Sequence, residues 1–219
     1  MDIKIPYTPR KHQAYLHRQI DNHRWNVLVC HRRFGKTVCM INHLIRSALL
    51  SKNKNPRYAY IAPTFKQAKS IAWDYMKQFT AKIPYTKFNE TELRVDLPNG
   101  SRITLLGSEN SDGLRGIYLD GCVIDEYANV NERLFPEIIR PALSDRKGYC
   151  VFIGTPQGMN NNFYELYQHA QGADDWFNYK AKASETKIVD EEELQKAKEV
   201  MGDKKYQQEF ECDWIANIE

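Results

Sequence analysis

Short apolar runs alternate with segments of helical periodicity along most of the 219-residue chain. Apolar runs bounded by turn residues are typical of buried strands, and apolar residues spaced three and four apart are typical of helices. The predicted strands are residues 26–30, 58–62, 119–125, 149–154 and 176–181. The predicted helices are residues 36–50, 64–79, 163–170, 191–201 and 204–214. This alternation predicts a mostly parallel sheet covered on both faces, with ligands at the carboxyl ends of the strands.

Residues 91–106 interrupt this alternation. The segments TELRVDL and SRITLL alternate apolar and polar residues on either side of Pro98-Asn99-Gly100. Asn-Gly between such segments is a strong β-hairpin signal, so we expect an antiparallel addition at an edge of the sheet. No fixed-period repeat or Pro/Gly/Ser linker divides the chain, and residues 1–219 are therefore expected to form a single domain.

Composition and charge narrow the class of protein. Hydrophobic residues make up 42% and charged residues 27%, and no apolar run approaches the eighteen or so residues of a membrane span. The N-terminus, MDIKIPYTPRK, lacks the features of a signal peptide, so an intracellular setting is expected. The net charge is only +3, but residues 1–60 hold twelve Lys or Arg against two Asp. This basic segment suits a polyanion such as phosphate or nucleic acid, and a solvated basic surface fits it equally well.

The cysteines and histidines do not suggest a zinc site. The five cysteines form no C-x-x-C pair, and four of them lie in apolar runs that suit a small buried side chain. The six histidines show no i, i+4 pair and no Cys/His cluster. We therefore expect the cysteines, at positions 30, 39, 122, 150 and 212, to serve packing or surface roles.

The stretch CHRRFGKT, residues 30–37, nearly matches the phosphate-binding pattern G-x-x-x-x-G-K-[ST], with Cys30 in place of the first glycine. Gly-Lys-Thr alone is a weak signal, but here it joins a predicted strand to a predicted amphipathic helix. Backbone N–H groups at such a helix start can bind phosphate oxygens. Lys36 would reach the β- and γ-phosphates of ATP, and the Thr37 hydroxyl would bind Mg²⁺.

Two further strand ends complete a candidate ATPase site. Asp125 and Glu126 end the third predicted strand, where Asp125 can hold Mg²⁺ through water and Glu126 can orient and deprotonate the attacking water. A simpler interpretation is that these two acidic residues only begin a turn at the end of the strand. Thr155, in Gly154-Thr155-Pro156, would lie beside the γ-phosphate if its strand neighbours the other two, although G-T-P alone is also a good stop signal.

The order of these motifs resembles the ATPase domain of a large terminase subunit, the DNA-packaging motor of tailed bacteriophages. The segments that carry the resemblance are PRKHQAYL, HRRFGKT, YIAPTFKQAK, GLRG ahead of VIDEYA, GTPQGMNNNFYELY and YQQEFECDW. The resemblance implies a P-loop NTPase of the RecA/ASCE type, a three-layer α/β domain with a mostly parallel central sheet and the hairpin addition. Family loops often replace the first glycine and carry an arginine, so Cys30 would be a tolerated variant.

The resemblance also implies roles for particular residues. Lys36, Glu126, Arg115 and Arg32 would be catalytic, with Arg115 reaching the ATP of a neighbouring subunit and Arg32 sensing phosphate. On local sequence alone, Arg115 also fits an ordinary turn, since glycines flank its segment. Thr155 would couple hydrolysis to movement, and Thr37 and Asp125 would bind Mg²⁺. The nucleotide-binding residues would be Gln13, Cys30, His31, Arg32, Arg33, Phe34, Gly35, Lys36, Thr37 and Val38.

The implied function is ATP hydrolysis that powers translocation of double-stranded DNA into a procapsid in the host cytoplasm. The implied partners are double-stranded DNA, the portal protein of the procapsid, the small terminase subunit and further copies in a ring, with no membrane. Residues 212–219 would begin the linker to an RNase H-like nuclease domain. Because no carboxylate cluster for two-metal cleavage follows, no nuclease activity is expected from residues 1–219.

Two alternatives stay open at the level of sequence. A helicase-like DNA-dependent ATPase would share the core and would unwind DNA. A non-catalytic DNA-binding or assembly module with a decayed nucleotide site would explain Cys30 and the basic N-terminal segment. Charge alone suggests DNA contacts at Lys52, Lys54, Arg57 and Lys66.

Overall fold

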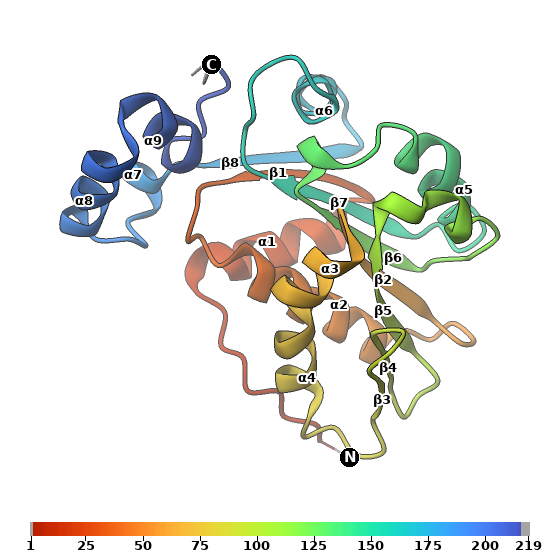
Figure 1. The fold of residues 1–219 in the computed structure, drawn as a ribbon. Helices are drawn as coiled ribbons and strands as arrows, with labels where there is room; N and C mark the ends of the chain where they lie inside the picture. The colour runs from red at the N-terminus through yellow and green to blue at the C-terminus, as the bar shows by residue number, and fades with distance from the viewer. Residues whose placement is uncertain (1, 216–219) are drawn as a thin grey trace.

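An eight-stranded sheet runs through the computed structural model, which describes residues 2–215 (Figure 1). The strand order is β3-β4-β5-β2-β6-β7-β1-β8. The strands are β1 (Trp25–Cys30), β2 (Arg57–Ala62), β3 (Lys87–Asn89), β4 (Arg94–Asp96), β5 (Arg102–Gly107), β6 (Gly121–Asp125), β7 (Tyr149–Gly154) and β8 (Trp176–Ala181). In this spatial order, each strand from β5 through β8 pairs in parallel with the next, while β3, β4 and β5 pair antiparallel at one edge of the sheet. The predicted α/β fold with a mostly parallel sheet and an added hairpin is confirmed.

The sheet is the middle of three layers. Alternate residues of β1 face opposite sides, with Leu28 and Cys30 in one core and Val27 and Val29 in the other. The first core is covered by α1 (Lys11–Asn22), α2 (Lys36–Leu50), α3 (Phe65–Ala68), η1 (Lys69–Trp73) and α4 (Asp74–Thr80). The second is covered by η2 (Ser108–Leu114), η3 (Tyr127–Asn129), η4 (Phe135–Ile139), α5 (Arg140–Ala142) and α6 (Asn162–Gln171).

A small helical unit follows β8 and lies beside the carboxyl end of β1 (blue in Figure 1). It contains α7 (Ala183–Thr186), α8 (Glu191–Met201) and α9 (Asp203–Phe210), which share a third apolar core. Two backbone hydrogen bonds join the end of β8 and α9 to the segment after β1. The His31 N–H donates to the Ala181 carbonyl at 3.0 Å, and the Arg32 N–H donates to the Glu209 carbonyl at 2.8 Å.

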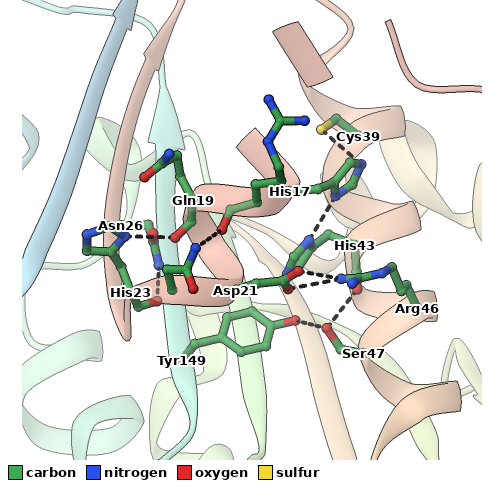
Figure 2. Close-up of polar contacts among 12 residues, drawn as sticks. His17, Gln19, Asp21, His23, Asn26, Cys39, His43, Arg46, Ser47 and Tyr149 are labelled. Carbon is green, nitrogen blue, oxygen red and sulfur yellow. Dashed lines mark hydrogen bonds and ion pairs between the residues drawn. The ribbon is translucent and has the colours of Figure 1, made fainter. Parts of the chain in front are cut away.

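Figure 2 shows polar side chains whose hydrogen bonds and ion pairs link α1 to α2. His17 and His43 share a hydrogen bond between their Nδ1 atoms at 2.8 Å, and the other ring nitrogen of His17 hydrogen-bonds to the Tyr7 hydroxyl at 2.8 Å. Asp21 pairs with Arg46 at 2.9 Å and approaches His43 Nε2 at 3.7 Å. Burial lowers the pKa of His17 to about 4 and of His43 to about 3. Both imidazoles are therefore neutral at pH 7.

Two helices differ from the prediction. The predicted helix 64–79 is present but contains the π-helical segment η1, which adds a wider turn between α3 and α4. The predicted helix 204–214 ends at Phe210. Cys212 then adopts a left-handed φ of 53°, and the turned chain packs Trp214 edge-on against Phe163 of α6. Burial of a tryptophan against α6 outweighs one more helical turn.

α1 was not predicted as an element. Its buried face consists of Leu16, Ile20 and the polar Gln13, too few apolar residues for a clear helical period. The predicted linker start at residues 212–219 lies partly outside the described residues. Within residues 2–215, no helix is both long enough and apolar enough to cross a bilayer.

Candidate nucleotide site

The candidate phosphate loop lies between the last residue of β1 and the first residue of α2. Gly35 caps α2 in the left-handed region, with φ of 88°. A Cβ atom at this position would lie 3.0 Å from Gln13 Nε2, so both conformation and space favour glycine. The first-turn N–H groups of α2 face the end of the sheet from which the loop emerges, which is the arrangement that binds phosphate.

The unusual Cys30 has a simple structural explanation. It is the last residue of β1, in register with Ala181 of β8, and its side chain is fully buried. Its backbone is extended and its φ is not positive, unlike that of Gly35. A side chain at position 30 therefore imposes no backbone strain.

Three predicted nucleotide-binding side chains face the protein interior. Cys30, His31 and Phe34 are each fully buried. The His31 Nε2 atom hydrogen-bonds to the Thr186 hydroxyl at 2.7 Å, and its ring meets Phe34 edge-on. Contacts of these residues with a nucleotide are consequently limited to their backbone atoms. Val38 packs against the first core.

The structure brings Lys36 and Thr155 together. Lys36 Nζ donates a hydrogen bond to Thr155 Oγ1 at 3.2 Å, across 119 positions of sequence. Thr155 directly follows β7, which pairs with β1 in parallel. The ends of β1, β7 and β6 are thus neighbours, as the interpretation of Thr155 requires.

The acid pair lies at the end of β6, next to β7. Asp125 is buried, with Oδ1 accepting the Glu126 N–H at 2.8 Å and Oδ2 accepting the Tyr60 hydroxyl. Glu126 has a left-handed φ of 49°, which costs a non-glycine residue free energy. Burial, followed by the charge of Asp125, raises the pKa of Glu126, while Lys36 opposes the shift.

The oxygen ligands at this edge fit a magnesium ion. The Thr37 hydroxyl lies in the first turn of α2, and the Asp125 carboxylate, at the end of β6, accepts a hydrogen bond from the phenol of Tyr60. Hydroxyl and carboxylate oxygens are hard ligands of the kind that Mg²⁺ prefers. Thr37 and Asp125 are therefore the residues that could hold this ion.

The other predicted nucleotide-binding residues are Gln13 of α1 and the loop arginines Arg32 and Arg33. Gln13 is buried; its Oε1 accepts the Arg10 N–H at 2.9 Å and its Nε2 donates to the Gly35 carbonyl at 3.1 Å. Gln13 thus supports the loop directly. The Arg32 side chain is exposed, and Arg33, with φ of 67°, forms a 3.8 Å ion pair with Glu193 of α8.

Arg115 lies apart from these residues. It follows η2, is exposed, and forms ion pairs with Asp112 at 3.3 Å and Glu137 at 3.6 Å. None of its ion-pair partners among the described residues belongs to the candidate site. An exposed position is what contact with a second subunit would require.

Sequence reasoning missed two residues at the site. Tyr60 lies within the apolar run YAYIA and was interpreted only as part of a strand. Glu209, in YQQEFECDW, accepts the Arg32 N–H through its carbonyl, and its charge contributes to the raised pKa of Glu126. The place of that motif in the resemblance was the available signal, but it did not indicate a contact with the loop.

Comparison with known proteins agrees with the fold and the motif order. A family model described as the N-terminal part of the T4-like-virus-type terminase large subunit matches residues 29–218. The large terminase subunit of Thermus phage G20c is 29% identical over 126 residues, which cover 49% of this chain and 26% of that protein. The large terminase subunit of Thermus virus P23-45 matches to the same extent. The chain thus spans about a quarter of the length of the curated relatives it matches.

Solved structures share this architecture. The large terminase ATPase domain of Thermus phage P74-26 superimposes with a TM-score of 0.81 at 22% identity, covering 96% of each chain. The large terminase of a second thermophilic bacteriophage, in complex with ADP, superimposes with a TM-score of 0.81 at 16% identity, covering 94% of this chain and 53% of that one. At these identities the likeness establishes the fold.

Proposed function

The chain belongs to the T4-like-virus-type large terminase subunit family, and we propose that it is a Mg²⁺-dependent ATPase that powers translocation of double-stranded viral DNA into a procapsid. One observation carries the proposal. Lys36, Thr155 and the Asp125-Glu126 pair, from three distant segments, meet at the ends of three neighbouring parallel strands. The ADP complex and the ATP-γ-S complex of the second thermophilic phage's large terminase support nucleotide as the ligand.

The roles follow from the chemistry of each group. The loop N–H groups and Lys36 bind and neutralise the phosphates. Glu126 orients a water molecule and accepts its proton. When bound, Mg²⁺ supplies charge neutralisation on the phosphate oxygens. Thr155, whose hydroxyl accepts a hydrogen bond from Lys36, would sense loss of the γ-phosphate.

Arg115 is proposed to act on the ATP of a neighbouring subunit. An arginine supplied in this way stabilises charge on the transferred phosphoryl group and contributes about 10³ to 10⁵ in rate. A ring of copies, docked on the portal protein with DNA and aided by the small terminase subunit, would then be the active form. The isolated chain would hydrolyse ATP slowly.

The decayed-site alternative is disfavoured by the conformation of the loop. Its main argument was the missing first glycine, but the extended backbone at position 30 does not require one. The groups that carry the chemistry, Lys36, Thr37, Asp125 and Glu126, are all present.

The test is equilibrium binding of a fluorescent ATP analogue with Mg²⁺. Because a charged hydrogen bond contributes about 1.5–3 kcal/mol, Lys36→Ala should weaken binding roughly 10- to 100-fold. The exposed Lys82→Ala is the matched control and should bind as the unaltered protein does. Equal affinity in Lys36→Ala would mean that the site is vestigial. A strand-displacement assay separates the helicase-like alternative, which would unwind DNA.

A further inference from the structure

Tyr60 occupies the centre of the sheet beneath the start of α2. It is fully buried and lies on β2, in register with Val123 of β6. Side chains two positions apart on a strand share a face, so Tyr60, Val123 and Asp125 all face the core that α2 covers. The Tyr60 ring therefore extends along this face toward the carboxyl end of β6.

The hydroxyl of Tyr60 contacts one of the two residues that could hold Mg²⁺. It donates a hydrogen bond to Asp125 Oδ2. A phenol carries one hydrogen, and an ionised carboxylate can only accept. The hydrogen of Tyr60 is therefore directed at Asp125, whose other oxygen accepts the Glu126 N–H at 2.8 Å. Each oxygen of the Asp125 carboxylate thus has a partner that fixes its orientation.

A purely structural role does not account for this hydroxyl. A buried phenol costs free energy unless it is hydrogen-bonded, and phenylalanine would fill the same volume without that cost. Tyr58, on the same strand and face, provides the contrast, because its hydroxyl donates to the backbone carbonyl of Ser47 at 3.3 Å. The partner of Tyr60 is instead a side chain of the candidate site, Asp125.

We propose that Tyr60 is a positioning residue for the metal ligand Asp125, and that its hydroxyl sets the orientation of this carboxylate for binding Mg²⁺ with nucleotide. The inference rests on the proposed ATPase function. It assigns the Mg²⁺ affinity of the site to a side chain that contacts neither nucleotide nor metal. Residues of this kind typically alter metal affinity or activity about 10- to 100-fold when they are changed.

The experiment compares Tyr60→Phe with the matched control Tyr58→Phe. Binding of a fluorescent ATP analogue is titrated with Mg²⁺, and binding is also measured in EDTA. Tyr60→Phe should raise the half-saturating Mg²⁺ concentration about 10-fold, while its affinity in EDTA stays within about 2-fold of the unaltered protein. Tyr58→Phe should leave both quantities unchanged. In an Asp125→Asn background, Tyr60→Phe should have no further effect on the Mg²⁺ dependence.

The outcomes separate the two proposals. An unaltered Mg²⁺ dependence in Tyr60→Phe would overturn the positioning role while leaving the ATPase proposal intact. An equal loss with Mg²⁺ and in EDTA would mean that Tyr60 only supports the fold, which also overturns the positioning role. Failure of the unaltered protein to bind nucleotide would refute the proposed function and this inference with it. Melting temperatures of the two Phe variants report on folding independently of ligand.

Discussion

Acidification should destabilise the protein through the neutral pair His17 and His43. In the unfolded chain both imidazoles would titrate near 6.5, whereas burial lowers the pKa to about 4 for His17 and about 3 for His43. The unfolded state therefore binds protons first as the pH falls. The stabilisation is fully present above pH 6.5 and is lost progressively as the pH falls, down to about pH 4 for His17 and about pH 3 for His43.

The size of the stability loss follows from the difference between the unfolded and folded pKa values of the two histidines. At pH 5.5 the two neutral imidazoles together lower the free energy of unfolding by about 2–3 kcal/mol. The charged groups nearest the pair oppose each other, since Asp21 raises both pKa values and Arg46 lowers them. The Cys39 thiol and the Tyr7 hydroxyl also face His17.

The assay is urea unfolding at pH 7.5 and pH 5.5. His43→Asn removes one of the two titrating groups. Between these pH values, its free energy of unfolding should therefore fall by about 1 kcal/mol less than that of the unaltered protein. The exposed His169→Asn is the control and should keep the full loss. An equal pH loss in His43→Asn and the unaltered protein would refute the reasoning, as would greater stability of the unaltered protein at pH 5.5.

Three further predictions concern the site and the sheet. Glu126→Gln should bind the ATP analogue normally but hydrolyse ATP at least about 100-fold more slowly, and undiminished phosphate release would exclude Glu126 as the base. Gly107→Ala places a Cβ 2.1 Å from the Phe65 backbone nitrogen and should lower the free energy of unfolding by about 2 kcal/mol or more. The control Gly172→Ala places its Cβ where no atom lies within 4 Å and should change this free energy little. Equal melting temperatures of the two variants would contradict this prediction. Mixing Glu126→Ala with Arg115→Ala protein under assembling conditions should restore turnover, and absence of rescue would argue against action in trans.

The parallel core was predictable because its strands are continuous apolar runs. β1, β2, β6 and β7 lie between helices on both faces, so nearly every side chain is buried and the run stands out in the sequence. α1 did not stand out, because Leu16 and Ile20 are its only buried apolar residues. The end of α9 could not be predicted either, because it depends on the packing of Trp214 against Phe163 of α6, which is distant in sequence.

Residues of the candidate site could be predicted where a local sequence motif marks them. They could not be predicted where only tertiary contacts bring them to the site. The phosphate loop and the acid pair carry recognisable residue types at strand ends. Tyr60 looks like any apolar strand residue, and only the register of β2 on β6 brings it to Asp125. Gln13 was predicted as a nucleotide-binding residue, but the hydrogen bond from its amide to the Gly35 carbonyl depends on how α1 packs on the loop.

The most direct test of the central claim is a crystal structure with a non-hydrolysable ATP analogue and Mn²⁺, whose anomalous signal locates the metal. The account predicts the triphosphate across the N-terminus of α2, with Lys36 on the β- and γ-phosphates and the metal bound to Thr37 beside Asp125. A nucleotide bound elsewhere, or a metal peak away from both residues at saturating ligand, would contradict it.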